Sequence, residues 1–163
     1  MSGNIKNSYG SSNQAITCTF GNNPTGTLSQ HGRLSAAIDN SADLFQEVFL
    51  QGKIKSGTSP SGNKQFVIFG LGSADGGTSY TDGYSAGDAD SSLVPVNTRP
   101  IINVLGPTST TLYPFGPIAV SPCFGGEMPD HWLILVFNDH GVTPSTTNAD
   151  HGFWYQGKFS QYT

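Results

Sequence analysis

The chain has 163 residues, of which only 11% are charged, compared with about 25% in an average soluble domain. Its net charge is -4 and its seven lysines and arginines are scattered singly, so it lacks the basic stripe of a nucleic-acid-binding protein and the polybasic cluster that holds a protein on an anionic membrane. We therefore expect neither nucleic acid nor a membrane as a partner. Hydrophobic residues at 36% suffice for a folded core, and the length indicates one domain.

The first segment, residues 1–13, is polar and rich in Gly, Ser and Asn. It lacks the apolar region of a secretory signal peptide, so we expect the chain to be made and assembled in the cytosol. We interpret residues 1–13 as a flexible N-terminal arm, which is either a frayed end or a segment that orders against a partner. Residues 14–163 are then a single β-sandwich domain.

Short apolar segments bounded by Gly, Pro, Asn or Ser recur along the remaining chain, which is the pattern of an all-β, antiparallel sandwich or barrel. We expect about eight strands, and no helical stripe of ten or more residues competes with them. In chain order the expected strands are residues 15–20, 34–38, 44–54, 65–71, 101–105, 112–120, 132–137 and 153–159.

Three of these segments allow a sharper prediction. Residues 65–71 and 132–137 are apolar at nearly every position, as expected for central strands that are covered on both faces. Residues 112–120 contain Pro114 and Pro117, which cannot donate to a ladder, so this strand is an edge strand or is bent. The two cysteines, Cys18 and Cys123, stand in apolar contexts and are interpreted as small buried hydrophobic residues rather than as a disulfide.

The long loop at residues 73–92 is the first candidate contact surface, because loops of this length are usually functional or mobile. It carries four aspartates, Asp82 among them, together with Tyr80 and Tyr84. A Ca²⁺ ion held by the aspartates is one interpretation. The ligand order of an EF-hand is absent, and a solvated, turn-rich loop is the favoured alternative.

Four aromatic residues, Tyr80, Tyr84, Trp154 and Tyr155, are candidates for an exposed platform on which a sugar ring stacks. Ordinary packing is the favoured alternative for all four. Under the platform interpretation the chain binds a glycan.

Enzymatic and metal sites are weakly indicated. Residues 83–87 match the GxSxG spacing around a hydrolase serine, with His140 further along the chain, but the strand before the serine and the helix after it are missing. Asp-His pairs occur at His131, His140 and His151, yet His131 and His140 bracket one strand and cannot share an ion. We expect no enzyme, no metal and no cofactor.

Four stretches together resemble a family of small virion proteins of tailed bacteriophages. They are residues 33–40 leading into 44–45, residues 80–83, residues 116–120, and residues 124–129 ahead of 132–138. The resemblance extends over roughly residues 16–155, with departures at Cys123, where the family has a small residue, and in the polar N-terminal arm.

The resemblance implies a jelly-roll-like β-sandwich that decorates or cements the outer capsid surface, usually as a homotrimer. The implied partners are the major capsid protein and further copies of the chain, and the implied location is the virion. Candidate partner or oligomer contacts are Arg33, Asp39, Tyr80, Asp82, Tyr84, Trp154 and Tyr155. For Arg33 and Asp39, a structural ion pair or a polar contact at a strand edge is favoured over partner binding.

Two functions follow from this sequence. The first is a capsid decoration protein that binds as an oligomer and stabilises the shell. The second, which depends on the aromatic residues and polar loops, is a carbohydrate-binding or receptor-adhesion module of a phage tail or baseplate.

Overall fold

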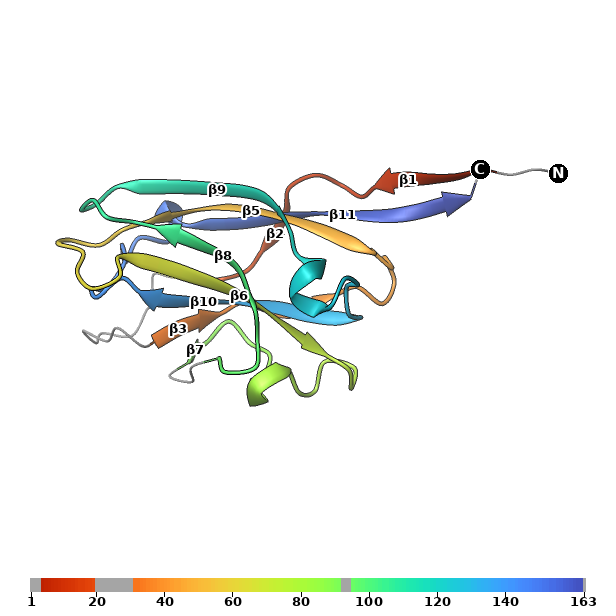
Figure 1. The fold of residues 1–163 in the computed structure, drawn as a ribbon, viewed down its shortest axis with the longest axis horizontal. Helices are drawn as coiled ribbons and strands as arrows, with labels where there is room; N and C mark the ends of the chain where they lie inside the picture. Colours follow the sequence, from red (N-terminus) through yellow and green to blue (C-terminus); the bar gives the residue numbers. More distant parts are fainter. Residues whose placement is uncertain (1–3, 20–30, 92–94, 163) are drawn as a thin grey trace.

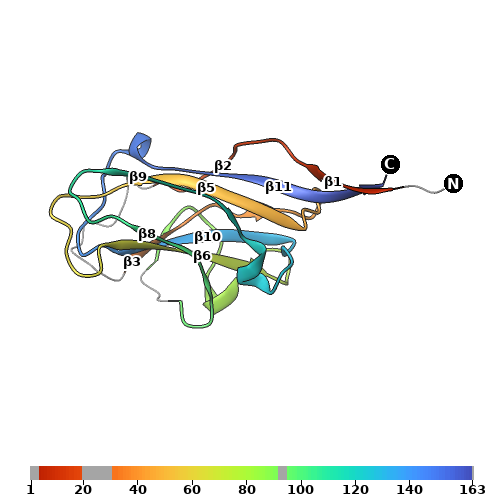
Figure 2. The ribbon, with the colours of Figure 1, turned by 45° about the horizontal axis from the view of Figure 1, so that its top comes forward.

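The computed structural model of the chain describes residues 4–19, 31–91 and 95–162. These residues form two antiparallel sheets packed face to face as a β-sandwich (Figures 1 and 2). Sheet A contains β1 (Ile5–Tyr9), β2 (Gln14–Ile16), β5 (Glu47–Lys55), β9 (Leu112–Ala119) and β11 (Gly152–Tyr162). Sheet B contains β3 (His31–Leu34), β4 (Ile38–Asp39), β6 (Gln65–Ser73), β7 (Asp90–Ser91), β8 (Pro100–Leu105) and β10 (His131–Asp139). Short 3-10 turns occur at η2 (Thr81–Gly83), η3 (Ser121–Phe124) and η4 (Asn148–Asp150).

The order of the strands confirms the expected sandwich and defines its topology. The principal strands lie in the order β2-β11-β5-β9 in sheet A and β3-β10-β6-β8 in sheet B. Successive strands alternate between the sheets except for β6 and β8, which is the strand order of a jelly roll. The described residues contain eleven strands rather than about eight, because the short strands β1, β4 and β7 are added to this frame of eight.

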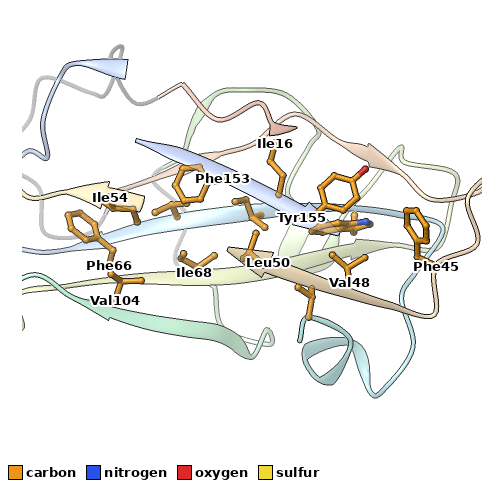
Figure 3. Close-up of a cluster of buried hydrophobic side chains, with 14 residues drawn as sticks. Ile16, Phe45, Val48, Leu50, Ile54, Phe66, Ile68, Val104, Phe153 and Tyr155 are labelled. Carbon is orange, nitrogen blue, oxygen red and sulfur yellow. The ribbon is translucent and has the colours of Figure 1, made fainter. Parts of the chain in front are cut away.

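The main core fills the space between the two sheets (Figure 3). In β5 every second residue points into it, so that Val48, Leu50 and Ile54 are fully buried. Sheet B, which faces β5, contributes Phe66, Ile68, Trp132, Ile134 and Val136, and the neighbouring strand β11 of sheet A contributes Phe153 and Tyr155. Trp132 and Tyr155 meet edge to face across the sandwich, with their ring centroids 5.6 Å apart.

A second, smaller core explains why β10 is hydrophobic at successive positions. Leu133 and Leu135 point away from the main core and pack, together with Leu34 and Leu71, against Tyr80 and Tyr84 of the loop after β6. Figure 1 shows this loop and η2 below sheet B. All residues at 132–137 are buried, so the prediction of a strand covered on both faces is confirmed.

Strand β9 lies at the edge of sheet A, as the two prolines predicted. Its register against β5 shifts between Leu50 and Gly52, where Gly116 has a φ of 86°. A Cβ atom at Gly116 would lie 2.4 Å from the Leu50 carbonyl oxygen, so only glycine fits this irregularity.

Several strand boundaries differ from those expected. The strand expected at 44–54 begins at Glu47, because Leu44 has a left-handed φ of 51° and an exposed side chain while Phe45 turns into the core. The segment expected at 34–38 is divided between β3 and β4, which both pair with β10. At the end of the segment expected at 15–20, residue 20 lies outside the described residues. Cys18 and Cys123 are both free and both pack against the main core.

The N-terminal arm differs from the flexible segment expected at residues 1–13, of which residues 1–3 lie outside the described part. Residues 5–9 form β1, which pairs with residues 158–162 of β11. β1 and the end of β11 extend past the body of the sandwich as a two-stranded ribbon (Figures 1 and 2). We call residues 5–9 and 158–162 the terminal ribbon. Backbone pairing, which composition does not reveal, orders this polar segment.

Candidate functional site

Arg33 belongs to a buried ion cluster rather than to an exposed contact. Its guanidinium contacts Asp88 and Asp90, with nitrogen to carboxylate-oxygen distances of 2.9 Å to each. Its Nη2 also donates to the backbone carbonyl oxygen of Asp88 at 2.7 Å, and the Thr19 amide donates to the Asp88 carboxylate. Arg33 is 7% exposed, so this cluster fastens the end of the 73–92 loop to β3.

The charges of the cluster stabilise one another. Burial opposes the charged form of Arg33, but hydrogen bonds from its guanidinium to Asp90 and Asp88 outweigh burial and raise its pKa. Burial likewise opposes the carboxylate of Asp88, but the Thr19 hydrogen bonds and Arg33 outweigh it and lower the Asp88 pKa. The guanidinium is thus occupied within the chain.

Asp39, the partner considered for Arg33, lies elsewhere. It is 64% exposed in its side chain, accepts a hydrogen bond from the Ser41 amide, and lies 3.6 Å from Nε2 of His131 across the β4–β10 pair. The expected Arg33–Asp39 pair is therefore wrong, because β3 and β4 are separate strands and Arg33 lies opposite β7.

The aspartates of the 73–92 loop accept hydrogen bonds from the protein itself. Asp75 accepts from the Ser79 and Thr78 amides and from the Ser73 hydroxyl, and these bonds lower its pKa to about 2. Asp82 has a left-handed φ of 61° and accepts from the backbone amides of Val96 and Asn97. The described residues hold no group of three or more His, Cys, Asp or Glu side chains placed to bind a metal ion.

Tyr80 and Tyr84 do not form an exposed platform. They are 4% and 2% exposed, and both pack against the outer side of sheet B. Burial raises the pKa of the Tyr84 phenol to about 12, with a further contribution from Asp82. The loop that we considered as a contact surface therefore covers the second core. For these two tyrosines, ordinary packing is the correct interpretation.

The neighbouring aromatics on β11 point to opposite faces of sheet A. Tyr155 pairs with Leu50 and points into the core, where it is 8% exposed. Trp154 pairs with Gln51 and points to the outer face, where it is half-buried. Of the four aromatic candidates, Trp154 alone lies on an outer surface, while Tyr155 is a core residue.

A shallow hollow of about 370 Å³ adjoins Trp154 on this outer face. It is lined by Gln51, Gly52, Pro114, Phe115, Gly116 and Trp154, none of which carries a charge. A second hollow shares Gln51 and continues along β5; it is lined by Ser12, Asn13, Phe49, Gln51, Pro117 and Gln156. We call the two hollows together the outer groove.

Two histidines of the Asp-His pairs, His140 and His151, are buried and bonded to backbone carbonyl oxygens. His140 is fully buried, stacks on Phe66 at a centroid distance of 4.7 Å, and bonds through Nε2 to the Gly106 carbonyl oxygen at 2.6 Å. His151 bonds through Nε2 to the Ser145 carbonyl oxygen at 2.7 Å. Burial lowers the pKa of both imidazoles.

The GxSxG match at residues 83–87 begins at the last residue of η2 and includes the buried Tyr84, whereas Ser85 is exposed. His140, which follows in the chain order of a catalytic triad, is enclosed between Phe66 and Gly106. A buried imidazole of this kind has no access to an exposed hydroxyl, so these two residues do not form a nucleophile and its base.

Comparison of the chain with protein-family models, curated proteins and solved structures found no match in any of the three. Among the described residues, no helix is both long and apolar enough to cross a membrane. The surfaces of the molecule and the resemblance of its four stretches are therefore the basis for inferring its function.

Two features of those surfaces were missed from the sequence. The terminal ribbon exposes Ile5 by 76% and Tyr9 by 58%. Ile5 and Tyr9 lie on one face of the strand, but the polar Asn7 stands between them, so residues 5–9 show no alternation that would identify a strand. The outer groove brings Gln51 and Pro114 beside Trp154, and that proximity depends on the β-sheet register.

Proposed function

We propose that this chain is a non-enzymatic decoration protein of a tailed-bacteriophage capsid, which binds the outer surface of the shell as a homotrimer and stabilises it. The family resemblance of the four stretches supports the phage assignment. The observation that carries the mode of binding is the terminal ribbon, because it leaves the body of the sandwich with exposed apolar side chains and open strand edges.

The physical properties of the ribbon favour a role in contacts. β1 is an edge strand, so its outer row of backbone N–H and C=O groups has no strand beside it within the described residues. Beyond Phe159, which packs against the main core, the ribbon has only two strands, and such a pair is marginally stable on its own. Burying Ile5 and Tyr9 against a neighbouring copy or the shell would remove apolar surface from water and supply further strand pairing.

The scarcity of charge fits the same function. Only 11% of the residues are charged, while Ser, Thr, Asn and Gly cover much of the surface. Such residues pack against a second protein surface without the cost of burying unpaired ions. Area and shape complementarity, rather than charge, supply the affinity in this proposal.

The direct test is mass spectrometry of purified virions of the phage that encodes the chain. We expect the chain at a copy number comparable with that of the capsid subunits. Its absence, or a copy number of only a few per particle, would contradict the proposal.

A matched pair of variants tests the role of the ribbon. Substituting both Ile5→Ser and Tyr9→Ser is expected to weaken cosedimentation with capsids that lack the chain by about tenfold or more, because each buried apolar side chain contributes about 1.5 kcal/mol or more. Val96→Ser is the control, since Val96 is 78% exposed but lies outside the ribbon. Equal binding by the control and the double variant would exclude the ribbon as the contact.

A further inference from the structure

Trp154 is half-buried on the outer face of sheet A. The ring lies over Gly152, where a Cβ atom would lie 2.4 Å from its Cη2 atom. No described residue hydrogen-bonds to the indole or stacks on it. One face of the ring is thus supported by backbone, whereas the hollow lined by Gln51, Pro114 and Gly116 lies beside it.

The polar groups around the ring are amides rather than charges. Gln51 Nε2 donates to Asn13 Oδ1 at 2.6 Å, and Gln156 Nε2 donates to the Gly10 carbonyl oxygen at 3.1 Å. These bonds fix the orientation of both side-chain amides and leave their Oε1 atoms as acceptors for hydroxyl groups. A charged ligand would find no complementary ion in the lining, so the groove favours a neutral ligand rich in hydroxyls.

The length of the outer groove suits more than one ring. Trp154 lies directly across from Gln51. Phe49 lies two residues before Gln51 on the same face of β5, so its Cα atom is about 7 Å from that of Gln51. Aromatic surfaces at this spacing, with an amide between them, match successive rings of a saccharide chain.

We propose that the outer groove binds a neutral oligosaccharide, with one pyranose ring stacked on Trp154 and its hydroxyls hydrogen-bonded to Gln51. Pyranose rings present an apolar face of C–H groups together with equatorial hydroxyls, which is the chemistry that an indole face beside an amide recognises. This function is separate from shell binding. A decoration protein attached through its ribbon would display the groove to glycans of the surroundings.

The test uses the purified full chain. A glycan array that holds both neutral and acidic glycans is screened first, and neutral hits are titrated together with maltotetraose, cellotetraose and chitotetraose. The tryptophan fluorescence reports binding, because the chain has two tryptophans and Trp132 is fully buried. We expect a saturable change with at least one neutral glycan. Binding of no neutral glycan, or a preference for acidic glycans, would overturn the proposal.

Variants separate the groove from the rest of the surface. Trp154→Ala is expected to weaken binding about tenfold or more, as truncation of a central tryptophan commonly does. Gly152→Ala keeps the tryptophan but pushes the indole from its support, and it is expected to weaken binding while circular dichroism is unchanged. Gln51→Ala removes the amide and is expected to have a smaller effect in the same direction.

The matched control is Leu112→Ala, which removes an exposed apolar side chain of sheet A that is not part of the groove lining. It is expected to bind as the unaltered chain does. Binding that survives Trp154→Ala, or that is lost equally in Leu112→Ala, would show that the groove is not the site. Since virions are not involved, these results do not depend on the shell proposal.

Discussion

Replacing Arg33 by alanine is expected to lower the free energy of unfolding by about 3 kcal/mol, because removal of the buried guanidinium leaves the partly buried carboxylates of Asp88 and Asp90 without a counterion. This figure lies at the low end for a buried ion pair, since the Asp90 side chain is 35% exposed and partly screened by water. For a domain of this length the loss corresponds to a fall in Tm of about 6 to 12 °C. Urea unfolding followed by the fluorescence of the buried Trp132 measures it.

The expected effect is large because Arg33 joins several segments. Its contacts with Asp88 and Asp90 hold the end of the loop that covers the second core, and Asp88 also binds the Thr19 amide after β2. Arg33→Lys retains one charge but has no planar fork to bridge both carboxylates, so an intermediate loss is expected.

Asp39→Asn is the informative control. The sequence offered Asp39 as the partner of Arg33, whereas the structure gives that role to Asp88 and Asp90. The Asp39 carboxylate is largely exposed, and asparagine preserves its acceptor for the Ser41 amide, so a change below about 0.5 kcal/mol is expected. If Asp39→Asn cost as much as Arg33→Ala, the ion cluster would not be the source of the stability.

The elements predicted best from the sequence are those whose hydrophobic pattern is local. Residues 132–137 were identified as a strand covered on both faces because six successive apolar side chains allow little else. The edge position of β9 followed from Pro114 and Pro117 in the same way. The class of the fold could be predicted because it is the sum of such patterns.

The features that were missed depend on contacts between distant parts of the chain. The apolar outer side of β10 predicted a cover, but nothing local showed that Tyr80 and Tyr84 supply it. The partners of Arg33 are set by the β3–β7 register, which brings together residues more than fifty positions apart in the sequence. The ribbon is held by backbone pairing between the two ends of the chain, and the composition of the side chains gives no sign of this pairing.

Acidification below pH 6.5 is expected to destabilise the fold through His140 and His151. Burial lowers the pKa of both imidazoles from the ordinary value of 6.5. Below pH 6.5 the unfolded chain therefore binds protons that the folded chain does not, and stability falls with falling pH. Each imidazole contributes a slope of up to about 1.4 kcal/mol per pH unit, which ends where its folded form is protonated.

The geometry shows why protonation is unfavourable. Nε2 of His140 donates to the Gly106 carbonyl oxygen, so a second proton has to reside on Nδ1, which is buried and has no acceptor among the described residues. In His151, Nδ1 accepts the Lys55 amide at 3.4 Å, and protonation would place two donors against each other. The negative charge of Asp150 raises the pKa of His151, but the positive charges of Lys53 and Lys55 lower it, so Asp150 offsets the effect of burial only in part.

Urea unfolding at intervals from pH 8 to pH 5 measures the effect. His140→Phe and His151→Gln are expected to lower stability at pH 8, and each to make the decline below pH 6.5 shallower. The slope is therefore the readout. For carboxylates with a lowered pKa, such as Asp75 and Asp88, protonation reduces stability only near and below their ordinary pKa of 3.8. They therefore do not contribute to the slope between pH 8 and pH 5. A flat profile from pH 8 to pH 5 would contradict the prediction.

The position of these histidines predicts where the molecule opens first in acid. His140 follows β10 and His151 precedes β11, so both lie at the end of the sandwich opposite the terminal ribbon (Figure 1). At pH 5.5, hydrogen exchange is therefore expected to accelerate in residues 106–111 and 140–151 before it does in the main core. If the terminal ribbon fastens the chain to a shell, acid would loosen the far end while the attachment remains. Earlier exchange in residues 158–162 than around His140 would contradict this order.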